Sequence, residues 1–151
     1  MKKKDVRLYN VLFPVWALVL FPSTWLVVIP GNFLIDSLVL IIAMKVLKME
    51  DRKGFYKKHI LPVFGFGFLA DILAAALMFG GVLLEIGGNY GDGPLLTIPG
   101  VLIAGVLIYV FNYFVSFRKC EKPLRKKLAL TFAIATAPYT FLIPSRWIYG
   151  F

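Results

Sequence analysis

Cysteine and histidine are nearly absent from this sequence, which contains one residue of each type. A disulfide framework, a zinc site and an iron–sulfur cluster all need several such side chains, so the sequence excludes all three. It also has no serine or cysteine nucleophile beside a histidine, and no glycine-rich loop of the phosphate-binding kind. We therefore expect neither a cofactor nor an enzyme.

Charged residues are scarce as well. They make up 17% of the 151 residues, whereas hydrophobic residues make up 60%, and the mean hydropathy is +0.80. This leaves too little polar surface to cover a water-soluble protein of 17.0 kDa. The composition predicts an all-α integral membrane protein, with a single transmembrane domain over residues 1–151.

Long apolar runs are abundant. A helix needs roughly 20 mostly apolar residues to cross a hydrocarbon core of about 30 Å. The run from Leu8 to Val46 is long enough for two crossings, and Pro30-Gly31-Asn32 is the strongest turn signal inside it. Three later runs each have the length of one crossing. The sequence therefore predicts a bundle of about five transmembrane helices, over residues 8–29, 33–47, 60–84, 98–117 and 128–143.

Basic residues are distributed unevenly between the two sides of this predicted bundle. One side receives 16 of the 17 Lys and Arg residues: four in the N-terminal segment, six at the loop between the second and third spans, counting Lys45 at the end of the second span, and six between the fourth and fifth. Only Arg146 falls on the other side. Cytoplasmic loops are enriched in Lys and Arg. We therefore expect a multi-pass protein of the cell membrane, not secreted, with its N-terminus in the cytoplasm and its C-terminus outside.

The same distribution accounts for the formal net charge of +9. Lys and Arg at a membrane surface attract anionic lipids, at about 1 kcal/mol for each residue. The expected partners of these charges are the lipid bilayer and its anionic headgroups on the cytoplasmic face, and no nucleic acid. We expect His59, beside Lys58, to be an interfacial residue, and Cys120 to be a free thiol without a role.

Two acidic residues, Asp36 and Asp71, lie inside the predicted spans, and a third, Glu85, lies at the outer end of the third span. A charge at the bilayer centre costs about 2.5–3.5 kcal/mol, so each needs a partner, a proton or a water-filled cavity. Glu85 lies near the outer end of its span and is expected to reach the headgroups. Asp36 and Asp71 each lie about 16 Å from the cytoplasmic ends of their spans. Because a short loop makes these spans antiparallel neighbours, we expect the two carboxylates to face each other and to share a proton or a cation.

Small and polar residues indicate which helix faces point inward. Asn32 lies one turn from Asp36, and Asn112 lies on the fourth predicted span. On the third span, a stripe at steps of three and four residues contains Gly67, Asp71, Ala75, Met78, Val82 and Glu85. Small residues on a helix face allow another helix to approach closely. The candidate ion or proton site therefore consists of Asp36, Asp71, Asn32 and Asn112.

The two aspartates admit three interpretations. Each carboxyl group could hold a proton and form a hydrogen bond with Asn32, Asn112, Ser37 or a backbone carbonyl. The pair could instead bind a transported proton or cation, or it could contact another subunit.

Two functions follow from these interpretations. The first is a proton- or cation-coupled transporter or channel subunit. It would assemble as a homo-oligomer, because five short spans leave little room for a transport pathway within one subunit. The alternative is a non-catalytic membrane scaffold or accessory subunit that binds a partner membrane subunit through Asp71 and its small-residue face. An aspartyl enzyme would be a third class, but a glycine close to the aspartate, typical of membrane aspartyl proteases, is missing here.

Cysteine labelling tests the predicted topology. After replacement of the native Cys120, a cysteine introduced at Gly91 should react with a membrane-impermeant reagent added outside the cell. A cysteine at Lys53 should not react, because that loop is expected in the cytoplasm. Equal labelling at both positions would contradict the five-span arrangement.

Overall fold

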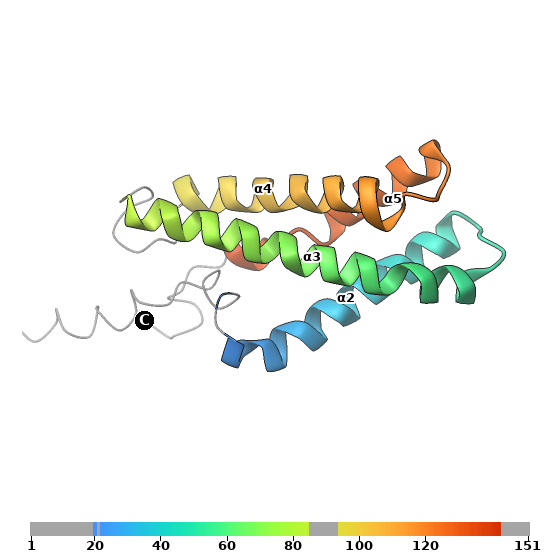
Figure 1. The fold of residues 1–151 in the computed structure, drawn as a ribbon, viewed down its shortest axis with the longest axis horizontal. Coiled ribbons are helices and arrows are strands. Elements are labelled where there is room, and N and C mark those ends of the chain that lie inside the picture. The colour runs from blue at the N-terminus through green and yellow to red at the C-terminus, as the bar shows by residue number, and fades with distance from the viewer. Residues whose placement is uncertain (1–19, 21, 85–93, 143–151) are drawn as a thin grey trace, which may run out of the picture.

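The computed structural model describes residue 20 and residues 22–84 and 94–142. These residues are mostly helical, with short turns between the helices, and they contain no strand (Figure 1). Their α-helices are α2 (Trp25–Val46), α3 (Arg52–Leu83), α4 (Pro94–Phe111) and α5 (Lys122–Ala135). A 3-10 turn, η2 (Pro22–Thr24), precedes α2, a π-helical turn, η3 (Asn112–Ser116), continues α4, and a second 3-10 turn, η4 (Tyr139–Leu142), follows α5. The all-α prediction is confirmed for this part of the chain.

The helices form an elongated bundle in which chain neighbours run antiparallel (Figure 1). Helix α3 packs against both α2 and α4, while α5 packs against α4 and α2. The loop between α2 and α3 and the loop between η3 and α5 therefore lie at the same end of the bundle (Figure 1).

Within the described residues, three helical segments are long and apolar enough to cross a membrane: Pro22–Val46, Arg52–Leu83 and Leu96–Ser116. The last two contain most of the predicted spans 60–84 and 98–117. Most of the first predicted span, 8–29, lies outside the described residues. Helix α5 has 14 residues, a length of about 21 Å, which is too short to cross alone.

The predicted turn at Pro30-Gly31-Asn32 is wrong. Helix α2 runs through these residues without a break from Trp25 to Val46, so the predicted boundaries at residues 29 and 33 do not exist. Pro30 removes one helical hydrogen bond, but a turn would expose several backbone groups. In hydrocarbon those groups would have no water to bond, so the helix is the less costly solution.

The predicted span 128–143 is also wrong in its boundaries. Helix α5 begins at Lys122, with Pro123 in its first turn, and ends at Ala135. Proline is well suited to the first turn of a helix, where its missing N–H has no intrahelical partner. Pro138 follows the end of α5 and disfavours helical conformation in the residue before it. The start of α3 is likewise earlier than predicted, because the Asp51 carboxylate accepts a hydrogen bond from the Gly54 N–H at 3.1 Å.

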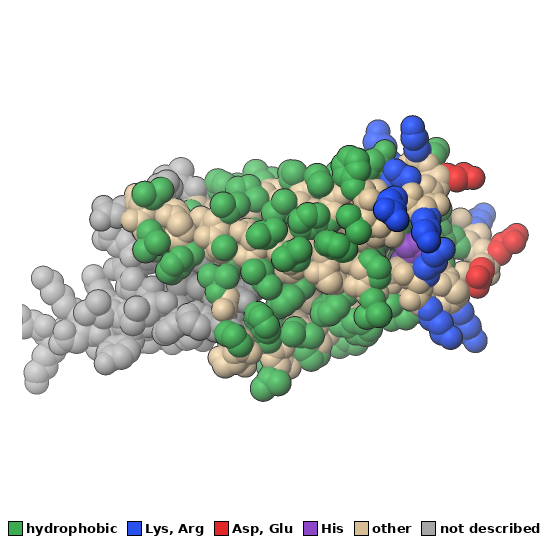
Figure 2. Space-filling model, in the orientation of Figure 1, with side chains coloured by type: hydrophobic (Ala, Val, Ile, Leu, Met, Phe, Trp, Pro, Cys, Tyr) green, Lys and Arg blue, Asp and Glu red, His purple; other side chains and the backbone are tan. Residues whose placement is uncertain are grey.

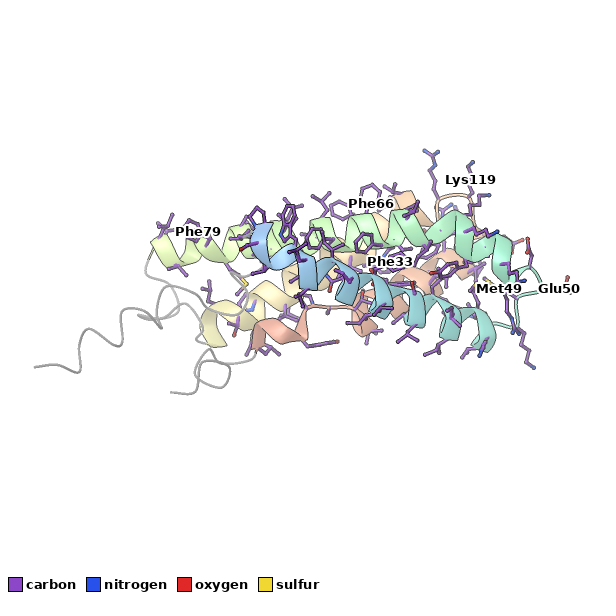
Figure 3. The ribbon with its side chains drawn as sticks, turned by 90° about the horizontal axis from the view of Figure 1, so that it is seen from below. Phe33, Met49, Glu50, Phe66, Phe79 and Lys119 are labelled. Atoms are coloured by element: carbon purple, nitrogen blue, oxygen red, sulfur yellow. The ribbon has the colours of Figure 1, made fainter. Side chains whose placement is uncertain are left out.

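The exposed charged side chains of the described residues gather at the end that carries the two loops (Figure 2). We call this the basic end; it contains Lys45, Lys48, Arg52, Lys53, Lys57, Lys58, Arg118, Lys119, Lys122, Arg125, Lys126 and Lys127. Glu50 and Lys119 lie together there, whereas Phe79 lies toward the opposite end of α3 (Figure 3). The surface between the ends is mostly hydrophobic (Figure 2). This separation of charge from apolar surface is what a membrane-embedded bundle requires.

Small residues bring α3 and α4 close together. Ala74 and Ala75 on α3 and Ala104 on α4 are fully buried. A Cβ atom added at Gly100 of α4 would overlap the Met78 side chain, which packs over this position. The close approach of the two helices therefore depends on the absence of a side chain at Gly100.

Substitution of Gly100 tests this packing. Gly100→Leu should destabilise the protein by about 1–3 kcal/mol, because the added side chain overpacks the contact with Met78. Gly80→Leu is the matched control, because nothing lies within 4 Å of a Cβ atom at that position. The measurement is unfolding in detergent followed by circular dichroism. Equal destabilisation by both variants would contradict the proposed close contact.

Candidate site at the paired carboxylates

Asp36 on α2 and Asp71 on α3 are both buried, with exposed fractions of 5% and 8%. A Cβ atom at Gly67 would lie 3.5 Å from Oδ2 of Asp36, so the Asp36 carboxyl group lies beside the backbone of α3. Gly67 is one helical turn from Asp71 on the same face. Asp36 is accordingly close enough to Asp71 for direct electrostatic repulsion between the two carboxylates. The structure thus brings together the two acids that the sequence places at similar depth.

The pair has no basic partner in the described part of the chain. No ion pair or hydrogen bond to either carboxyl group is present among those residues, and Oδ1 of Asp71 is buried without any hydrogen-bond partner. Two uncompensated negative charges in a low-dielectric interior are strongly unfavourable. A proton or a cation would remove one of them, so the pair has the electrostatics of a site for a positive species.

Asn112 and Asn32 flank this pair but do not hydrogen-bond to it within the described residues. Asn112 is 1% exposed, and both polar atoms of its amide lack a partner. The neighbouring Phe111 ring contacts Phe66 of α3, with 5.5 Å between ring centroids. Asn112 therefore lies level with the turn of α3 that precedes Gly67. Asn32 is half-buried one turn from Asp36, on the side away from the basic end.

Ser37, another partner considered for the aspartates, is bonded elsewhere. Its hydroxyl lies 2.9 Å from the hydroxyl of Tyr56, and this hydrogen bond joins α2 to α3. Together with the unpartnered amide of Asn112, it removes two of the side-chain partners proposed for a protonated aspartate. This bond could not be predicted from residue spacing, because the two residues lie on different helices.

The stripe of residues predicted to face inward is confirmed at several positions. Asp71, Ala75 and Met78 are buried on α3. Ala43 on α2 and Ala129 on α5 are buried as well. Glu85 and Asp92 lie outside the described residues.

His59 and Cys120 form a cluster that was not predicted from the sequence. His59 is 5% exposed and stacks on Phe55 and Phe117, with ring centroids 4.0 and 5.4 Å away. Its Nδ1 lies 2.9 Å from the Phe55 carbonyl oxygen, and its Nε2 lies 3.9 Å from Cys120 Sγ. Burial raises the pKa of the Cys120 thiol, which favours its neutral form. Only the contact between Phe55 and His59 could have been predicted from the sequence, because these residues lie four positions apart on one helix.

The described residues contain no group of three or more His, Cys, Asp or Glu side chains that could hold a metal ion. The two aspartates alone supply fewer protein ligands than a dedicated magnesium or calcium site. A cation at this pair would keep part of its hydration shell or take further ligands from outside the described residues.

Infrared spectroscopy tests the proximity of the two acids. Asp36→Asn should shift the carboxyl band of Asp71, and Asp71→Asn should shift that of Asp36, because each substitution removes a neighbouring carboxylate. Glu121→Gln is the control, since this residue is exposed at the basic end. An unchanged band in the surviving acid would mean that the two groups act independently.

Comparisons with known proteins do not extend this description. No protein-family model, curated protein or solved structure gives a significant match to the chain. The functional interpretation therefore depends on the buried carboxylates, the unpartnered polar atoms and the distribution of charge.

Proposed function

We propose that the protein is a proton- or cation-coupled transporter or channel subunit of the cell membrane, in which Asp36 and Asp71 bind the transported or coupling species. The observation that carries this proposal is the juxtaposition of two buried carboxylates without a basic partner among the described residues. Ionisable residues inside a membrane are costly, and they typically mark ion paths or proton relays.

The depth of the pair supports this function. Asp36 lies ten residues from the end of α2 at Val46, which is about 15 Å along a helix. This distance is half of a hydrocarbon core of about 30 Å. A site near the middle of the membrane is accessible in turn from either side when the surrounding helices rearrange. Asn112 and Asn32 provide polar groups on the two sides of the pair.

We further propose that the basic end faces the cytoplasm and that the full chain makes five crossings, with the N-terminus inside and the C-terminus outside. The clustering of Lys and Arg at one end supports this orientation. The crossings beyond the three apolar helices would come from the N-terminal residues and from the C-terminal part that includes α5.

A second copy or a partner membrane subunit would complete the pathway. The interior of the described bundle is filled by large side chains, since Leu40, Ile108, Phe117, Leu128 and Phe132 are fully or almost fully buried. A packed interior of this kind leaves no continuous channel through the described part of one copy. Assembly as a homo-oligomer would supply the remaining wall of the transport pathway.

The scaffold alternative receives less support from the packing. It requires the small-residue face of α3 around Asp71 to be free for a partner helix. Ala70, Ala74 and Ala75 have exposed fractions of 0% within the single chain, so this face is already covered.

Flux measurements in reconstituted vesicles test the proposed function. Asp36→Asn and Asp71→Asn should leave the protein folded and inserted, because an amide costs less than a carboxylate at this depth. Each variant should abolish proton or cation flux, whereas Glu121→Gln, a charge-neutralising control at the basic end, should retain it. Wild-type vesicles that show no flux with several cations and with a pH gradient would refute the proposal.

A further inference from the structure

A cavity at the basic end is distinct from the paired carboxylates. It has a volume of about 210 Å³ and opens between α3 and the turn that follows η3. Its walls are formed by Lys58, His59, Val115, Ser116, Arg118 and Lys119. Three of these six side chains are permanently cationic at neutral pH, and none is acidic.

Ser116 lines this cavity and carries a buried hydroxyl without a hydrogen-bond partner among the described residues. Its side chain is 7% exposed. Buried polar atoms in proteins nearly always have a partner, so a vacant hydroxyl in a cavity wall points to a ligand or to ordered water. The adjacent cations favour an anion over water.

The walls of the cavity are held in place by contacts elsewhere in the fold. His59 is fixed by its stacking on Phe55 and Phe117. Arg125 donates hydrogen bonds from Nη2 to the backbone oxygens of Arg118, at 2.5 Å, and Cys120, at 3.3 Å. The turn that carries two of the cations is therefore braced from α5, which lowers the cost of ordering it around a ligand.

We infer that this cavity binds a phosphate group, held by Lys58, Arg118, Lys119 and the hydroxyl of Ser116. The guanidinium of an arginine matches two phosphate oxygens at once, and lysine supplies a compact positive charge. A serine hydroxyl completes such a site as a neutral donor. The phosphate can belong to the headgroup of an anionic lipid or to a free ion, because both present the same oxygens.

A second basic cavity at the same end provides an internal control. It has a volume of about 250 Å³ and is lined by Arg52, Lys53 and Lys57 together with Ile41, Met44 and Tyr56. It therefore has the same number of cations but no serine, and the hydroxyl of Tyr56 is already bonded to Ser37. None of the unpartnered buried polar atoms of the described residues lies in its walls. If binding reflected only general attraction between cations and an anionic surface, both cavities would contribute equally to it. If the first cavity is a specific phosphate site, binding would depend on that cavity alone.

The experiment uses the full chain in nanodiscs and has two arms. In the first, nanodiscs of phosphatidylcholine are titrated with inorganic phosphate, and binding is followed by ³¹P NMR. In the second, a small fraction of phosphatidic acid is included, and its retention by the protein is measured by native mass spectrometry. Binding in the first arm identifies free phosphate as a ligand, and binding in the second arm alone identifies a lipid headgroup.

Three variants decide whether binding is specific to the cavity. Ser116→Ala keeps every charge and should weaken binding about tenfold, because it removes a hydrogen bond to a charged group. The triple substitution Lys58→Gln, Arg118→Gln and Lys119→Gln should weaken it at least as much.

The matched triple substitution in the second cavity, Arg52→Gln, Lys53→Gln and Lys57→Gln, removes the same charge and should change binding by less than about twofold. Equal losses in the two triple variants, no loss in Ser116→Ala, or no binding in either arm would overturn the inference. Proton or cation flux does not enter these readouts, so this test is independent of the proposed transport function.

Discussion

The absence of water inside a bilayer is the constraint on which this fold depends. Every backbone N–H and C=O in hydrocarbon must find its partner within the chain, and an α-helix satisfies all of them locally. Helices α2, α3 and α4 each contain an internal proline, at Pro30, Pro62 and Pro99, and none of them is broken there. The same constraint sends polar side chains inward. Asp36, Ser37, Asp71, Asn112 and Ser116 are all buried among the helices, while the surface between the two ends of the bundle is mostly hydrophobic.

Two kinds of polar group result from this arrangement, and they differ in charge and in depth. The carboxylates of Asp36 and Asp71 lie deep in the bundle, where a positive species would relieve their repulsion. The cations of Lys58, Arg118 and Lys119 surround a cavity at the basic end, where an anion would relieve theirs. Ionisable side chains within membrane-spanning segments are costly. The described bundle is therefore polarised along its length, with two carboxyl groups deep among the helices and Lys and Arg gathered at one end.

The sequence predicted those features that follow from hydropathy and helical periodicity. The spans at 60–84 and 98–117, the segregation of Lys and Arg, and the inward direction of Asp36, Asp71 and Ala75 all follow from apolar length, charge and residue spacing. The sequence did not predict that α2 continues through Pro30, because a proline and a glycine together resemble a turn unless the cost of an open backbone in lipid is included. The early end of α5, the bond between Ser37 and Tyr56 and the burial of His59 beside Cys120 depend on contacts between helices. Spacing along one helix carries no information about such contacts.

The π-helical turn η3 places Ser116 and Phe117 in register with the basic-end cavity and with His59. A π-helical turn contains one more residue than an α-helical turn would need for the same advance. If η3 rewound as α-helix, every later residue would rotate by about 100° around the helix axis. Ser116 would then leave the cavity wall, and Phe117 would leave the face of the His59 ring. The extra residue thus acts as a register shift between the amide of Asn112, at the start of the turn, and the cavity at the basic end.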